Sequence, residues 1–414
     1  MPDWRDLTEL AAGLAGGARR AARAVERALG KTGAYRVVGY RGYGTTERLL
    51  ILGRVIEHTR IADANPSQPR WRNLLATLQR IDAEPLPHAT VRAHVVTNAQ
   101  GASAPVPLGA DDEGFLRHWI TPHKPVVRRG WHDVDLELVS APDTDEQRAL
   151  EVRSRPARVL VPSTAAQYGV VSDMDDTVLQ SQITSFLRAA QLMLLENART
   201  RLPFPGVAAF YRALERGTLP AEQRDNPIFY VSSSPWNLYD VIADFLEAQE
   251  IPAGPMLLRD WDIGASLLRN QEYKLAQIRE ILRTYPALPF MLVGDSGQED
   301  PEIYSTLVSE FPERILAIYI RNVSAHPERS AAIRTLAEQV TAAGSSLVLA
   351  DDTLTVARHA AAHGWIREDA LADIGTEKRA DEGTTGAKVD APGLTNEQAP
   401  TVVVDQTVRR KDVE

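Results

Sequence analysis

Acidic residues and a threonine follow an apolar run near the middle of the chain. Residues 170–177 read Val-Val-Ser-Asp-Met-Asp-Asp-Thr, which places carboxylates at Asp173 and Asp175 and a hydroxyl at Thr177. Two carboxylates two positions apart at a strand end reach one small volume, and their repulsion is unfavourable unless a cation offsets it. Oxygen ligands without other donors favour magnesium. The alternative is an exposed acidic turn that caps the following helix.

Two later segments supply groups suited to holding a phosphate. The apolar run that begins at Phe229 ends in three serines, and Ser232, the first residue after the predicted strand, is expected to donate to a phosphoryl oxygen. Lys274 opens a predicted helix, where its ammonium can neutralise phosphate charge. Taken singly, the first segment can be an ordinary serine-rich loop and the second an ordinary solvent-exposed lysine. Their order along the chain, each beside a predicted strand, favours a common site.

A third apolar run ends in an acidic loop with the sequence GDSGQED over 294–300. Asp295, the first residue after the predicted strand, is expected to bind the metal, and the loop glycines allow a tight turn around it. Asp300 precedes a proline, which suits the first turn of a helix. It is expected either to orient the metal ligands or Lys274, or to cap that helix.

The elements that position these residues form a predicted parallel α/β domain over residues 165–375. Apolar strands alternate there with helical patterns, as in YGVVSD, NPIFYVSSS, PFMLVGDS, RILAIYIR and SSLVLAD. Buried parallel strands read as near-continuous apolar runs. In an open parallel sheet, ligands bind at the carboxyl ends of the strands, where the polar residues above lie. Residues 376–414 are polar and aperiodic, and a disordered tail is predicted.

The N-terminal part has a different organisation. Residues 1–33 contain an Ala-rich amphipathic helix with several arginines, and packing on the protein is favoured over a membrane surface for it. Residues 34–164 contain short β-rich runs separated by Gly, Pro and Asn, which predict an all-β, sandwich-like domain. The segment 183–195 is an apolar helix that either covers the site or contacts a bilayer.

Composition limits the remaining function classes. The 414 residues include 46 Lys and Arg against 55 Asp and Glu, for a formal charge of −9 and no general attraction to nucleic acid. The absence of cysteine excludes disulfides, thiolate catalysis and Cys-ligated metals. No run reaches the roughly 18 apolar residues of a membrane span, and the charged start does not resemble a signal peptide. We expect a cytoplasmic protein, with peripheral membrane contact and oligomeric state left open.

The polar segments together resemble the haloacid dehalogenase-like phosphatases over residues 165–372. FYVSSSPWNLYD, YKLAQIREIL and LVGDSGQEDPEIY are similar to the actin-patch type of phosphatidate phosphatase and its bacterial relatives, which are distant relatives of the lipins. The β-rich part adds GYRGYG at 39–44 and DEGF at 112–115, both typical of that family. One departure is Tyr273, where the family pattern has His before the lysine.

The resemblance implies a Rossmann-like fold and magnesium-dependent hydrolysis of a phosphomonoester. It assigns Asp173 as the nucleophile that forms an aspartyl-phosphate and Asp175 as the acid/base partner. Magnesium is then held by the Asp173 carboxylate, the Asp175 main-chain carbonyl and Asp295. Ser232 and Lys274, with Thr177, are expected to bind the phosphoryl group.

Three functions are compatible with these residues. The favoured one is hydrolysis of phosphatidate to diacylglycerol and phosphate. The second is hydrolysis of a soluble phosphomonoester or a phosphoprotein by the same chemistry. The third, a non-catalytic phosphatidate-binding module, normally goes with loss of a catalytic aspartate, and here both Asp173 and Asp175 are present.

Overall fold

The computed structural model describes eleven stretches of the chain: 34–58, 85–98, 101–102, 104–126, 129–140, 154–174, 205–220, 226–259, 267–324, 326–386 and 402–404. Several predictions fall outside these ranges. They are the amphipathic helix over 1–33, the apolar segment 183–195, and the site residues Asp175 and Thr177. The structure does not test these predictions.

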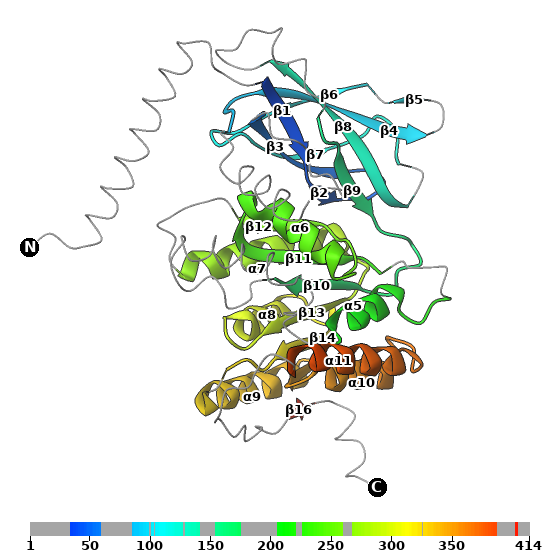
Figure 1. The fold of residues 1–414 in the computed structure, drawn as a ribbon, viewed down its shortest axis with the longest axis vertical. Coiled ribbons are helices and arrows are strands. Elements are labelled where there is room, and N and C mark those ends of the chain that lie inside the picture. The colour runs from blue at the N-terminus through cyan, green and yellow to red at the C-terminus, as the bar shows by residue number, and fades with distance from the viewer. Residues whose placement is uncertain are drawn as a thin grey trace, which may run out of the picture.

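A parallel sheet forms the centre of the C-terminal half (Figure 1). Within the described ranges its order is β12-β11-β10-β13-β14-β15, with β16 antiparallel at the β15 edge. The central strands are buried, which is why they read as continuous apolar runs. The strand bounds are β10 Gly169–Asp173, β11 Ile228–Pro235, β12 Met256–Arg259, β13 Phe290–Asp295, β14 Ile315–Arg321, β15 Ser346–Ala350 and β16 Val402–Val404.

Helices pack against this sheet in two groups. Contacts join α7, α8 and α9 into one layer and α5, α10 and α11 into another, as Figure 1 shows. The predicted mixed α/β architecture with a parallel sheet is therefore confirmed. The helix bounds are α5 Val207–Arg216, η1 Trp236–Leu238, α6 Tyr239–Ala248, α7 Leu267–Thr284, α8 Asp300–Glu310, α9 Pro327–Ala342, α10 Thr353–Ala362 and α11 Ala370–Gly386.

The N-terminal part is β-rich, as predicted. One sheet has the order β1-β3-β7, and the other has the order β2-β9-β8-β4-β5 with β6 paired to β4. Apolar side chains from both sheets share one core, in which Leu49 and Ile51 meet Val134 and Val159. The strand bounds are β1 Ala34–Gly39, β2 Arg41–Tyr43, β3 Leu49–His58, β4 Thr90–Asn98, β5 Gly101–Ala102, β6 Val106–Gly109, β7 Phe115–Ile120, β8 Gly130–Ser140 and β9 Ala157–Val161.

The C-terminal boundary differs from the prediction. Helix α11 continues to Gly386 and β16 pairs with β15, so the predicted disordered tail over 376–414 begins too early. The part of this helix after residue 375 was missed because its glycines and threonines, as in the run Glu-Gly-Thr-Thr-Gly, have low helix propensity, whereas α11 packs on α5 and α10. Within the described ranges, every helix falls short of the length or the apolar character that a bilayer crossing requires.

Candidate active site

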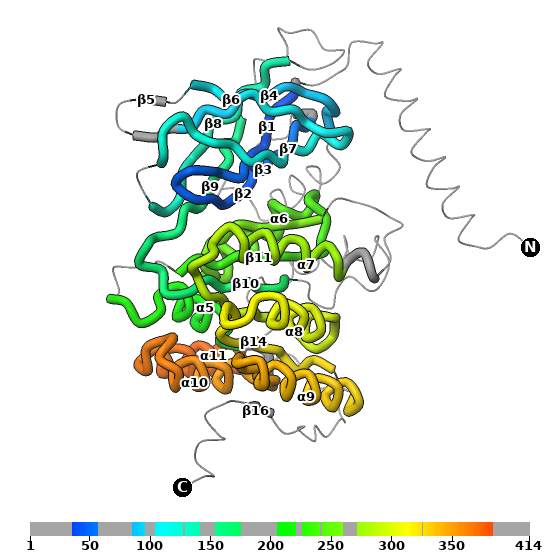
Figure 2. The backbone as a smooth tube through the Cα atoms, turned by 180° about the vertical axis from the view of Figure 1, so that it is seen from behind, coloured from blue at the N-terminus to red at the C-terminus, as the bar shows by residue number. Residues whose placement is uncertain are grey.

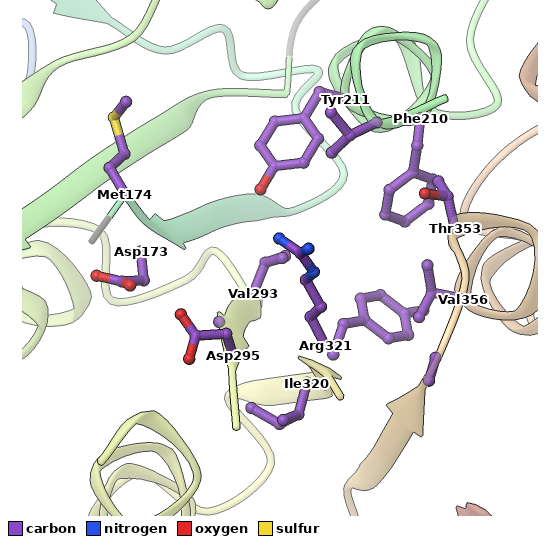
Figure 3. Close-up of a pocket in the computed structure, with 14 residues that line it drawn as sticks. Asp173, Met174, Phe210, Tyr211, Val293, Asp295, Ile320, Arg321, Thr353 and Val356 are labelled. Carbon is purple, nitrogen blue, oxygen red and sulfur yellow. The ribbon is translucent and has the colours of Figure 1, made fainter. Parts of the chain in front are cut away.

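Those predicted site residues that the structure describes meet where the order of the sheet reverses. The chain runs from β10 outward to β11 and β12, then returns to the other side of β10 as β13 and continues outward. This switch point leaves a crevice at the carboxyl ends of the strands, where ligands of open α/β sheets bind. Asp173 is the last residue of β10 and Asp295 is the last residue of β13. The two carboxylates therefore lie near each other at the crevice (Figure 3).

A buried lysine connects two of the carboxylates. Lys274 Nζ donates to Asp173 Oδ1 at 2.7 Å and to Asp300 Oδ1 at 3.2 Å, and the three side chains are 5%, 4% and 0% exposed. It also donates to Gln298 Oε1 at 3.3 Å. Such charge-assisted hydrogen bonds are stronger than neutral ones. The ammonium thus lies beside the predicted nucleophile, where it can meet a phosphoryl oxygen.

The lysine reaches this place from inside a helix rather than from its start. Helix α7 begins at Leu267, so Lys274 lies about two turns into it and the prediction that it opens the helix is wrong. The apolar residues around it, Leu275 and Ile278, face the core. Tyr273, where the family pattern has His, donates its hydroxyl to the Leu258 carbonyl and so ties α7 to β12.

Asp295 lies close to two other carboxylates at the crevice. Burial, and then the nearby Asp300 charge, raise the pKa of Asp295 to about 6, although the amides of Gly297 and Gln298 donate to its Oδ1 at 2.6 and 3.2 Å. Oxygen atoms of Asp173, Asp295 and Asp300 lie within 4.8 Å of one another. Repulsion among clustered carboxylates is relieved by a bound cation, and hard oxygen donors without His or Cys fit magnesium.

Asp300 accepts hydrogen bonds from its neighbours in the site and does not cap a helix. Its Oδ1 accepts from Lys274, its Oδ2 accepts from the Asp295 amide at 3.2 Å, and α8 is capped by Glu299 without a side-chain bond. Gly294 permits this approach, because a Cβ there would lie 2.5 Å from Asp300 Oδ2. Of the two roles predicted for Asp300, the structure favours orientation of its neighbours.

Arg329, on α9, supports the acidic loop and was not found by the sequence reasoning. Its guanidinium donates to the carbonyls of Ser296 at 3.0 Å and Gln298 at 2.5 Å, and it is paired with Glu302. Two orphan carbonyls of the loop are thereby satisfied, which fixes the loop's shape. An arginine near the start of a distant helix carries no local sequence signal for this contact.

Ser232 differs in detail from its prediction. Strand β11 runs on to Pro235, so Ser232 lies within it, although the regular pairing with β12 breaks after Val231. The side chain is fully buried, and its Oγ accepts from the Ser234 amide at 3.0 Å. Donation from this hydroxyl to a phosphoryl oxygen stays a prediction.

A pocket extends from the two carboxylates along the strand ends. Its walls are mainly apolar, with Phe210 of α5 and Val356 of α10 at the far end (Figure 3). Arg321, the last residue of β14, projects into the middle toward the Tyr211 hydroxyl. That hydroxyl shares a 2.6 Å hydrogen bond with Ser172, and burial raises the pKa of Tyr211 to about 12, so it stays neutral. The pocket suits a group with an apolar body and one polar or anionic end.

Solved structures resemble the chain only weakly. A β-glucuronidase from Bifidobacterium dentium has a TM-score of 0.20 at 11% identity, over 76% of this chain and 43% of that one. A glycosyl hydrolase family 2 member from Bacteroides cellulosilyticus has a TM-score of 0.25 at 8% identity, over 80% of this chain and 40% of that one. Scores of this size carry no argument about fold or function.

Sequence comparisons match part of the chain. The chain is 31% identical over 156 residues to Phosphatidate phosphatase APP1 of Saccharomyces cerevisiae, over 37% of this chain and 25% of that protein. It is 26% identical over 195 residues to Uncharacterized protein C29B5.04c of Schizosaccharomyces pombe, over 45% of this chain and 30% of that protein. The matched regions thus span less than a third of either relative's length. A family model described as the catalytic domain of phosphatidate phosphatase APP1 matches residues 168–322, which confirms the resemblance of this segment to the actin-patch type of phosphatidate phosphatase.

Proposed function

We propose that this protein is a magnesium-dependent phosphatidate phosphatase with a haloacid dehalogenase-like catalytic domain. The observation that supports this most strongly is the buried Lys274 between Asp173 and Asp300, with Asp295 near enough to share a cation. These groups come from four separate elements, β10, α7, β13 and α8, and converge at the switch point of the sheet. They all lie within the segment that matches the catalytic-domain family model.

The chemistry starts at Asp173. Its carboxylate attacks phosphorus and forms an aspartyl-phosphate while the alcohol leaves, so that one difficult step becomes two easier ones. Asp175 gives a proton to the leaving alkoxide and then takes one from the water that hydrolyses the aspartyl-phosphate. Magnesium, when bound by Asp173, the Asp175 carbonyl and Asp295, lowers the repulsion between nucleophile and anionic substrate.

Lys274 and Ser232 bind the phosphoryl oxygens in this scheme. The Lys274 ammonium already lies 2.7 Å from the attacking carboxylate, so a phosphorus atom bound by Asp173 has a cation beside it. Fixed charges and donors of this kind stabilise the charge that develops in the transition state without reorganisation. Asp300 keeps the lysine in place through its 3.2 Å contact.

The pocket beside the carboxylates is suited to the leaving alcohol. Its apolar walls can receive the glycerol and the first methylenes of a lipid, and the Arg321 guanidinium can donate to an ester carbonyl. A small soluble phosphomonoester would use the same carboxylates and leave most of the apolar surface uncovered. Selectivity for lipid therefore depends on this pocket, and peripheral membrane contact remains a prediction.

The test is phosphate release from phosphatidate in mixed detergent micelles, with magnesium or with EDTA. Water-soluble phosphomonoesters run alongside, and Asp173→Asn serves as the control because it keeps the shape of the side chain and removes the nucleophile. Magnesium-dependent release that prefers phosphatidate and is absent from Asp173→Asn supports the proposal. Release confined to soluble esters would support the reaction but show that the substrate is not phosphatidate. Phosphatidate binding without any phosphate release would indicate a binding module rather than an enzyme.

A further inference from the structure

The β-rich part shares a core with the catalytic domain. Along β3, Leu49 and Ile51 point into the core between the two β-sheets, while Leu50 and Leu52 point the other way and join the core of the catalytic domain. Successive side chains of a strand alternate between faces, so the sheet β1-β3-β7 is buried on both. Figures 1 and 2 show this part stacked on the α6 and α7 side of the catalytic sheet, at the end opposite β16.

Aromatic rings line this junction and reach the strand that carries Ser232. Tyr43 is fully buried and meets Phe229 of β11 edge-on, with ring centroids 5.5 Å apart. On its other side it meets Trp119 of β7, also edge-on at 5.5 Å. Edge-to-face pairs have a preferred geometry, so they fix the orientation of one element relative to another.

Several polar contacts of the junction fall on α7, the helix that carries Lys274. Glu280 accepts from Arg117 Nη2 at 2.5 Å through one carboxylate oxygen and from Trp119 Nε1 at 2.7 Å through the other. Arg117 Nη2 also donates to Gln277 Oε1 at 3.0 Å. Both donors belong to β7, so a single strand of the β-rich part binds two successive turns of α7.

These contacts fall on the turns of the helix that follow the lysine. Gln277 follows Lys274 by three positions and is its neighbour on the helix surface, and Glu280 is in turn a neighbour of Gln277, about 120° around the helix from Lys274. At 1.5 Å of rise per residue, Gln277 is about 4.5 Å along the axis from Lys274. The end of α7 is tied as well, because the Tyr285 hydroxyl donates to the Gly44 carbonyl at 3.0 Å. Rotation and sliding of α7 are therefore both restricted by the β-rich part.

We propose that Arg117 and Trp119 are positioning residues for Lys274, and that the β-rich part thereby contributes to phosphoryl binding. This proposal rests on the proposed phosphatase function. Lysine has a long flexible side chain, and its ammonium meets a phosphoryl oxygen at a defined distance only if the helix that carries it does not turn. Displacements of about 1 Å at a reacting centre lower rates by up to about 100-fold, so a small rotation of α7 has a measurable effect.

Arg155 offers a matched control at the same junction. Arg155 Nη1 donates to Asp240 Oδ1 at 2.6 Å, and Arg155 and Arg117 are 42% and 40% exposed. Asp240 lies on α6, which carries none of the predicted site residues. Arg117→Ala and Arg155→Ala each remove one partly exposed guanidinium that is paired with a carboxylate across the junction, and only the first removes a contact of the lysine helix.

The experiment compares the full-length variants by steady-state phosphate release, by calorimetric binding of inorganic phosphate in magnesium, and by Tm. We expect Arg117→Ala to lower kcat and weaken phosphate binding, each by about tenfold. We expect Arg155→Ala to leave kcat and phosphate binding within about twofold of the wild type. Its Tm should fall by about as much as the Tm of Arg117→Ala. Arg117→Lys, which keeps one donor to Glu280, should recover part of the loss.

Equal kinetic losses in the two alanine variants, or unchanged phosphate binding in Arg117→Ala, would overturn the positioning role. A wild-type protein that releases no phosphate from any ester would instead refute the proposed function. In that case phosphate binding still decides the positioning role, because it needs Lys274 in place and requires no turnover.

Discussion

Removal of the buried lysine gives the sharpest test of the site's electrostatics. Lys274 is 5% exposed and is hydrogen-bonded to Asp173 and Asp300, which are 4% and 0% exposed. Lys274→Met keeps the length of the side chain and leaves these two buried carboxylates without their shared cation. Breaking a buried ion pair from one side destabilises a protein by about 3–5 kcal/mol. For a domain of this size, about 3 kcal/mol corresponds to a fall in Tm of roughly 6–12 °C.

A second substitution separates stability from catalysis. Asp300→Asn on top of Lys274→Met removes one of the two unpaired charges and keeps a side chain that accepts from the Asp295 amide. We therefore expect the double variant to regain about half of the lost stability or more, because the two effects are coupled. Neither variant should release phosphate, since both lack the cation that meets the phosphoryl group.

Thermal and denaturant unfolding should be measured in EDTA, so that no divalent cation replaces the lost charge. Magnesium added afterwards should raise the Tm of Lys274→Met more than that of the wild type. The reasoning fails if Lys274→Met is as stable as the wild type in EDTA, or if the double variant is no more stable than the single one. Either result would mean that the carboxylates are protonated or solvated rather than dependent on the lysine.

Two further substitutions test the acidic loop. Gly294→Ala should lower kcat by about tenfold, because the added Cβ would lie 2.5 Å from Asp300 Oδ2 and displace that carboxylate. Gly383→Ala is the control and should behave as the wild type, because a Cβ there meets nothing within 4 Å. Equal activity of the two variants would contradict this expectation. Arg329→Ala should weaken magnesium binding several-fold, seen as a smaller magnesium-induced rise in Tm, because the loop that carries Asp295 loses its donors to two carbonyls. An unchanged magnesium titration would show that the loop keeps its shape without the arginine.

Much of the fold was predictable because the catalytic strands are buried on both faces. Such strands read as apolar runs, and the polar residues that end them mark the carboxyl edge of the sheet. Asp173 and Asp295 were found in this way, Lys274 was found beside a predicted helix start, and the structure brings the three together. The predicted roles of Asp175 and Thr177 fall outside the described residues and stay predictions.

Element boundaries were harder to predict, for local reasons. Lys274 was placed at a helix start because a polar stretch with weak apolar periodicity precedes it, yet α7 begins at Leu267. The tail prediction missed the second half of α11 because glycine and threonine lower helix propensity there. In both places, the chain's local preference was weaker than the packing of the helix on its neighbours.

The sequence by itself determined the chemistry available to this protein: carboxylates, a lysine and serines at strand ends, without cysteine and without a strong net charge. Only the tertiary structure decided how those groups are held. Arg329 reaches the acidic loop from α9, and Arg117 reaches α7 from a strand 160 residues away in sequence. Such contacts leave no local pattern, because an exposed arginine on a strand or helix has the same sequence signature whether or not a distant element accepts its hydrogen bonds. The same holds for the alternating apolar side chains of β3, because their sequence pattern does not show which element covers each face of the strand.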